Sequence, residues 1–118
     1  MDRLTKAEEP IMKIIWDKGD VFVKEIVEDL PDGTPYNTVS SLVRILESKG
    51  MVGHKAFGRT HQYFPLVKRG EYRKHMLKNM IVDYFDGSYK GLLSQILEDE
   101  EVSQEEVNEL KALLNKDS

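Results

Sequence analysis

The sequence predicts a mostly α, α+β fold, in which a small domain of helices and one hairpin (residues 1–70) precedes a small three-helix domain (residues 71–118). Three observations predict it. Apolar residues recur at helical spacing through most of the first 49 residues. Two short segments of strand-forming residues then flank Gly58-Arg59, a two-residue turn signal. The remainder of the chain returns to helical spacing.

The first helix is expected from about Thr5 to Lys18. Thr5 and Glu8 have the spacing of a capping box, in which the two side chains cover unpaired backbone amides. Pro10 lacks a backbone donor. Either the helix therefore begins later, near residue 9, or its first turn is distorted.

Two further helices are expected over about residues 23–30 and 36–49, separated by the turn signal Pro-Asp-Gly-Thr-Pro. In the second of them the apolar stripe consists of Val39, Leu42, Val43 and Leu46. The opposite side carries an amide, hydroxyls and one guanidinium, whereas a merely solvated helix face is usually rich in Lys and Glu. Such groups can read base edges, so this helix resembles the recognition helix of a helix-turn-helix.

The residues of that face are the candidates for reading bases. Arg44 can bind guanine in a bidentate manner and Asn37 can pair with adenine, while hydroxyl groups discriminate less and also bind phosphate. The alternative is an ordinary exposed helix face. The candidates from this pattern are Asn37, Thr38, Ser40, Ser41 and Arg44.

The expected strands, residues 51–56 and 60–64, form a hairpin that would serve as the wing of a winged helix. Its register stays open, because a slip of one residue exchanges the two faces. Basic and polar side chains at the hairpin, together with the end of the preceding helix, are candidates for contacts with the DNA backbone, which position a protein without specifying sequence. These candidates are Lys49, Lys55, Arg59, Thr60 and His61.

Charge is segregated along the chain. The net charge is −4, yet residues 36–70 carry six basic side chains and one acidic side chain, whereas the segments on either side are acidic. A local basic patch is the electrostatic footprint of phosphate binding. The charge pattern therefore points to double-stranded DNA independently of the helix pattern.

Composition argues against several other classes of function. The chain has no cysteine, which removes disulfides, thiolate catalysis and cysteine metal sites. His54 and His61 lie on neighbouring expected strands without a third ligand nearby, and no nucleophile–base set or phosphate-binding glycine loop occurs. We therefore expect no metal, no cofactor and no enzymatic activity. Without a signal core or a membrane-length apolar run, we expect a cytoplasmic protein that does not insert into membranes.

Residues 71–118 carry more apolar surface than three short helices can bury alone, so a second copy of the chain is expected to cover it. Ser103 and Glu106 have capping-box spacing and open the last of these helices. The expected dimer surface consists of Tyr72, Met76, Met80, Ile81, Tyr84, Phe85, Leu92, Leu93, Ile96, Leu97, Leu110, Leu113 and Leu114.

Four stretches in order, LTKAEEPIMKIIW, NTVSSLVRILESKG, GRTHQYFP and LEDEEVSQEEVNELKALL, resemble the penicillinase-repressor family over nearly the whole chain. The resemblance implies a winged-helix domain, a helical dimerisation domain and a homodimer that represses transcription from a palindromic operator, often of β-lactam resistance genes. By position it places Tyr36, Asn37, Thr38 and Ser41 at the start of the recognition helix and Arg59 at the wing tip.

Two branches of that family differ from this chain. The copper-responsive branch uses a cluster of cysteines, which this chain lacks. The antibiotic-responsive branch is inactivated when a protease cuts an Asn-Phe bond in the C-terminal domain, and the aligned pair here is Gln95-Ile96. The resemblance thus implies a membrane sensor protease as a further partner and Gln95-Ile96 as the cleavage site.

Two classes of function remain open from sequence alone. One is a DNA-binding homodimeric repressor. The other is a winged-helix module that binds protein and uses its helical tail for assembly, since fold alone does not decide. A protein-binding module would expose apolar residues where this chain has a neutral polar helix face and a basic hairpin.

Overall fold

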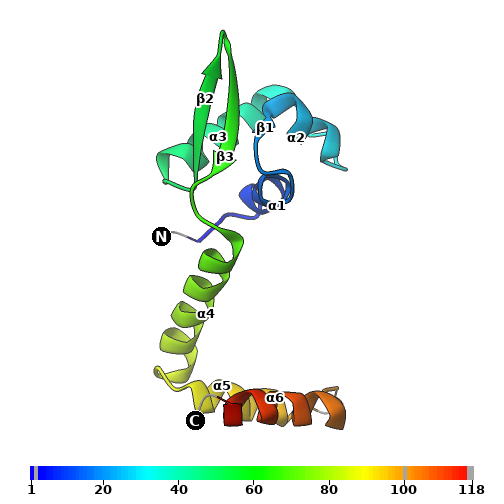
Figure 1. Cartoon of the computed structure of the whole chain (residues 1–118), viewed down its shortest axis with the longest axis vertical. Coiled ribbons are helices and arrows are strands. Elements are labelled where there is room, and N and C mark those ends of the chain that lie inside the picture. The colour runs from blue at the N-terminus through cyan, green and yellow to red at the C-terminus, as the bar shows by residue number, and fades with distance from the viewer. Residues whose placement is uncertain (2, 100, 117–118) are drawn as a thin grey trace. The chain divides into compact units, whose positions relative to one another are not determined.

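The computed structural model describes residues 1, 3–99 and 101–116, with the side chains of residues 110, 111 and 113–116 outside the description. The chain forms two compact units, Met1–Met76 and Leu77–Ser118, and helix α4 (Arg69–Phe85) runs across the boundary between them. The mostly helical fold with a winged helix is confirmed (Figure 1). In the described residues no helix is both long and apolar enough to cross a membrane.

The first unit is a winged helix built around one apolar core. Its sheet has the order β1-β3-β2, and both pairings are antiparallel. The core contains Ile11 and Ile15 from the first helix, Val39 from the third, and Tyr63 from the sheet. The elements before α4 are α1 (Glu8–Lys18), β1 (Val21–Phe22), α2 (Val23–Asp29), α3 (Tyr36–Ser48), β2 (Val52–Phe57) and β3 (Thr60–Pro65).

Helix α1 begins at Glu8, one residue from the later start near residue 9 that Pro10 had suggested. The predicted capping box is present: Thr5 N donates to Glu8 Oε1 at 2.9 Å, and Glu8 N donates to Thr5 Oγ1 at 3.2 Å. Pro10 is the third residue of the helix, where a backbone amide has no partner within the helix. The first turn therefore accommodates the proline.

Strand β1 was not predicted, because a strand of two residues is too short to show any alternation. Val21 pairs with Tyr63 and Phe22 with Gln62, so this short segment becomes the edge of the sheet beside β3. The side chain of Val21 is fully buried. The helix-turn-helix consists of α2 and α3. Strand β1 therefore connects the start of this motif to the wing.

The structure fixes the register of the wing. His54 pairs with Tyr63 and Phe57 with Thr60, so Gly58 and Arg59 form the predicted two-residue turn (Figure 1). Gly58 has a φ of +61°, the left-handed value that the first position of a type II′ turn requires and that glycine adopts without strain.

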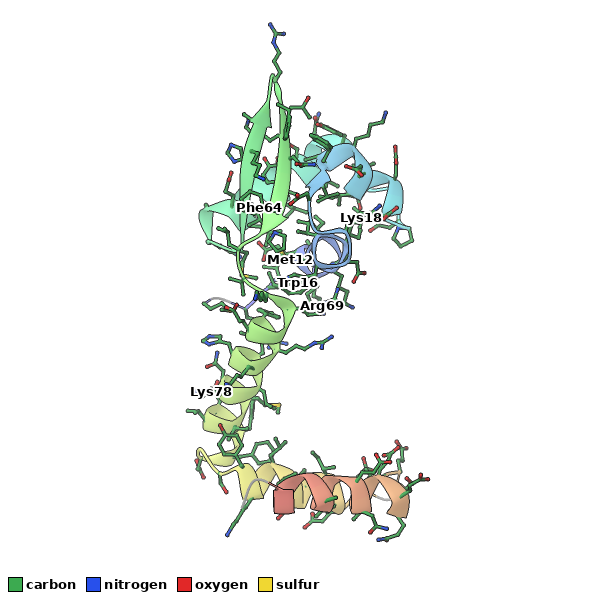
Figure 2. All side chains as sticks on the ribbon, viewed as in Figure 1. Met12, Trp16, Lys18, Phe64, Arg69 and Lys78 are labelled. Atoms are coloured by element: carbon green, nitrogen blue, oxygen red, sulfur yellow. The ribbon has the colours of Figure 1, made fainter. Side chains whose placement is uncertain are left out.

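Tyr72 differs from its predicted place on the dimer surface. Its hydroxyl accepts a hydrogen bond from Leu4 N at 3.0 Å, and its ring lies 5.6 Å from that of Trp16, centroid to centroid. Arg69 lies over the same indole, with its guanidinium carbon 5.7 Å from the ring centroid (Figure 2). The first turns of α4 therefore belong to the winged helix, because they present an aromatic side chain to its core.

The second unit contains the end of α4, then α5 (Tyr89–Leu97) and α6 (Gln104–Lys116). Ser88 caps α5 by accepting from Gly91 N at 3.1 Å, and Ser103 caps α6 by accepting from Glu106 N at 3.1 Å. Of the side chains described in this unit, Ile81 alone is buried. The unit therefore has little core of its own.

Candidate nucleic-acid interface

Helix α3 separates its apolar and polar faces as predicted. Val39, Val43 and Leu46 are fully buried, and Leu42 packs partly buried against the core. The opposite face is open to solvent. The exposed candidates for reading bases are Tyr36, Asn37, Thr38, Ser41 and Arg44, while Ser40 is half-buried.

Candidates from the helix and from the wing meet in one cleft of about 110 Å³ within the first unit. Tyr36, Ser40 and Arg44 line it from α3. The other walls come from the start of α2 and from the wing. They consist of Val23, Arg59, Thr60, His61 and Tyr63.

Tyr63 is the member of this cleft that the sequence did not suggest. It is only 3% exposed, and the pairing of His54 with Tyr63 places it on the inner face of the wing. Burial, and then the charge of Glu47, raise the pKa of its phenol, whereas the neighbouring guanidinium of Arg44 opposes that rise. The strand register, had it been known, would have indicated this residue.

The cleft is electropositive. Neither Arg44 nor Arg59 forms a salt bridge with any residue that the structure describes. No carboxylate lines the walls. Two arginines thus line a small polar space whose described lining holds no carboxylate, which suits an anion.

His54 and His61 stack on the inner face of the wing, with ring centroids 4.1 Å apart and planes within 9°. His54 Nδ1 also bonds to the carboxylate of Glu47, on α3. Across the described ranges, no group of three His, Cys, Asp or Glu residues is placed to hold a metal ion. The pair instead links the wing to the recognition helix beside the cleft.

The two lysine candidates lie apart from the cleft. Lys55 projects from the other face of the sheet, where its Nζ lies 5.8 Å from the centroid of the Phe64 ring. Lys49 binds Glu8, with its Nζ 3.0 Å from both carboxylate oxygens. We therefore assign Lys49 a structural role in place of the backbone contact expected from sequence.

The expected dimer residues divide into three groups. Met80, Tyr84 and Leu97 are exposed in the single chain, and Tyr84 reaches 80% exposure. A second group is half-buried or, for Ile81, buried: Met76, Ile81, Phe85, Leu92, Leu93 and Ile96. The side chains of Leu110, Leu113 and Leu114 lie outside the described residues. Three exposed apolar side chains of the second unit were not in the expected set: Leu77, Val82 and Tyr89.

A helix-turn-helix with an exposed polar second helix and a cationic wing defines the class of DNA-binding winged-helix proteins. The penicillinase repressor family matches residues 4–116. The chain therefore belongs to the penicillinase repressor family, whose members are DNA-binding transcriptional repressors and not enzymes.

Individual relatives align with this chain over nearly their whole length. The methicillin resistance regulatory protein MecI of Mammaliicoccus sciuri is 31% identical over 116 residues, which cover 96% of this chain and 94% of the relative. The MecI protein of Staphylococcus aureus (strain N315) gives the same figures. The penicillinase repressor of Bacillus licheniformis is 25% identical over 114 residues, covering 95% and 89%.

Proposed function

We propose that this protein represses transcription as a homodimer bound to a palindromic operator, in the cytoplasm. The observation that carries the proposal is that polar residues of α3, including Arg44, line one cleft together with Arg59 and His61 of the wing. In this proposal α3 enters the major groove, and the wing follows the neighbouring backbone. Two exposed large apolar side chains occur on α3, Tyr36 and Ile45, and the remaining exposed side chains of the helix are polar.

Within the proposed interface, contacts divide by chemistry. Asn37 and Ser41 project from the exposed face of α3 and would read base edges, with Thr38 beside them. Lys55, Arg59, Thr60 and His61 would position the protein on the backbone. Tyr36 at the start of α3, together with Ser40 and Arg44, completes the base-reading set that the sequence suggested.

The homodimer is supported by the imbalance in the second unit, where one described side chain is buried and six large apolar ones are exposed. A second copy of the chain would cover this surface, because soluble proteins rarely leave large contiguous apolar patches exposed. A twofold dimer would then place two recognition helices on half-sites about 10 bp apart, or a multiple of it.

The names of the relatives suggest the regulated genes. Methicillin resistance regulatory protein and penicillinase repressor both refer to β-lactam resistance, so we propose an operator that controls such genes. We further propose that induction involves a membrane sensor protease that cuts at Gln95-Ile96. Both residues lie in α5, with Gln95 exposed and Ile96 half-buried, so cutting would require local opening of that helix.

A salt titration of DNA binding tests the function. The full-length protein should bind a duplex from its own promoter more tightly than a shuffled duplex of equal length, and both affinities should fall with salt. Lys55→Ala should weaken both duplexes equally and reduce the salt slope by about one unit. Equal affinity of the wild-type protein for the two duplexes would refute the operator proposal.

A further inference from the structure

We propose that the cleft between α3 and the wing holds one backbone phosphate of the DNA, shared by Arg44 from the helix and Arg59 from the wing. The inference rests on the proposed DNA binding and changes the role expected for Arg44, from reading a guanine to binding a phosphate. In this proposal the cleft, which Tyr63 also lines, is a defined anion site.

The composition of the cleft supports a phosphate over a base edge. The residues that line it carry two guanidinium groups, the hydroxyl groups of Ser40 and Tyr63, and the imidazole of His61. Nearly all of these groups donate hydrogen bonds, and a phosphate offers only acceptors. Guanine also presents only acceptors in the major groove, but a phosphate adds a full negative charge, which two guanidinium groups complement and a neutral base edge does not.

The position of the cleft supports a backbone phosphate over any other anion. A recognition helix in the major groove and a wing beside it must straddle the strand that separates the two grooves. The cleft lies between these two elements and is lined by both. The backbone strand would therefore pass its mouth.

The surroundings that the structure describes leave the two guanidinium groups without a competing carboxylate. Arg44 lies beside the buried phenol of Tyr63, and Arg59 occupies the second position of the tight turn that Gly58 makes possible. The Glu47 carboxylate, the negative charge closest to this region on α3, bonds to His54 instead. Among the described residues, both guanidinium groups are therefore without a carboxylate partner.

Binding of the full-length protein to promoter duplexes that carry single methylphosphonate substitutions tests the inference. One neutralised phosphate per half-site should lower wild-type affinity by about 10- to 100-fold. The Arg44→Gln/Arg59→Gln double variant should be weakened already and should not respond to that same substitution. Lys55→Gln, a matched change on the other face of the same hairpin, should keep the wild-type response.

The salt slope supplies a second readout. If both arginines share one phosphate, the double variant should lose about 0.9 units of slope, whereas two separate phosphates would cost about 1.8. Thermal unfolding of the double variant and of Lys55→Gln checks that these substitutions at exposed positions leave the fold intact.

Three outcomes would overturn the shared phosphate while leaving the repressor function standing. The first is that the losses of affinity caused by Arg44→Gln and by Arg59→Gln add up in the double variant, together with the larger change in salt slope. The second is an altered preference between promoter and shuffled duplex in Arg44→Gln, which would mean base reading. The third is displacement of DNA by inorganic phosphate beyond that by chloride at equal ionic strength, which would assign the cleft to a free anion. Failure of the wild-type protein to prefer its promoter would instead overturn the proposed function.

Discussion

Lys49, just past the end of α3, binds Glu8 at the start of α1, with its Nζ 3.0 Å from both carboxylate oxygens. Glu8 is only 1% exposed and accepts a further hydrogen bond from Thr5 N. The carboxylate of Glu8 therefore takes part in the capping box of α1 and also binds the residue that follows the C-terminal end of the recognition helix. The pair holds α3 at a set position on the core while its polar face stays free.

Lys49→Met should destabilise the protein, because it leaves the carboxylate of Glu8 buried without its counter-charge. The cost should be about 1–3 kcal/mol, since the ammonium itself keeps some contact with solvent. Urea unfolding followed by circular dichroism measures it. Lys74→Met, at an exposed position on α4, is the control, and equal stability of the two variants would remove the role assigned to Lys49.

The effect of Lys49→Met should vanish in acid. Burial raises the pKa of Glu8, but the hydrogen bonds from Thr5 and Lys49 outweigh burial and hold it below its ordinary 4.5. A carboxyl with a lowered pKa stabilises the fold fully above its unfolded pKa and loses this contribution as pH falls through the folded pKa. The unfolding free energies should therefore differ most near neutral pH. The difference should shrink as the pH falls through the folded-state pKa of Glu8 in the variant, which is raised by loss of the Lys49 ammonium, toward that in the wild type. A difference that grows in acid would contradict this assignment.

Asn37→Ala should relax the preference for one base pair in each half-site, because an exposed amide at the start of α3 can pair with adenine. The loss on the correct duplex should be about 1–3 kcal/mol, with little change on shuffled DNA. Binding to a set of single-base-pair variants of the operator measures it. A uniform loss on all duplexes would make Asn37 a backbone contact.

Tyr84→Asp should convert the proposed dimer to a monomer, because it places a charge on the most exposed large apolar side chain of the second unit. Sedimentation at micromolar concentration measures the state of association, and Lys78→Asp on the same helix is the control. The monomer should bind the two-half-site duplex roughly 10²–10⁴-fold more weakly. A monomeric wild-type protein would contradict the dimer.

Cleavage, if it releases the repressor, should occur at Gln95-Ile96. A pocket fitted to the family's Asn-Phe pair loses packing against Ile, and the extra methylene of Gln costs about 1–3 kcal/mol in a fitted pocket. Cutting should therefore be slow. Mass spectrometry of the protein from β-lactam-treated cells measures it, and an intact chain beside a derepressed gene would exclude proteolysis.

Local patterns were sufficient for most elements of the fold. The apolar stripe of α3, the capping of α1 by Thr5 and the turn at Gly58 each depend on residues within one helix or one hairpin. Such short-range regularities are visible in a sequence because periodicity and turn chemistry act between near neighbours. The exposed polar face of α3 followed from the same stripe, since one face of a helix determines the other.

Contacts between distant segments could be decided only by the tertiary structure. Tyr72 follows the apolar spacing of α4, yet it packs on Trp16, more than fifty positions earlier. Lys49 has the charge of a phosphate ligand, yet a carboxylate 41 positions away binds it. In both cases the residue type allows two partners, and the packing of α1 against the rest of the unit selects one.

The sequence by itself determined which helix of this protein is polar on its outer face, where positive charge gathers and where the hairpin turns. The tertiary structure decided which of these groups meet. A strand pairing has a side-chain period of two, so only the pairing of His54 with Tyr63 places His61 and Tyr63 on the inner face and Lys55 on the outer one. Arg44 and Arg59 line one cleft because the sheet is docked on α3, and side-chain spacing along a chain carries no record of that docking.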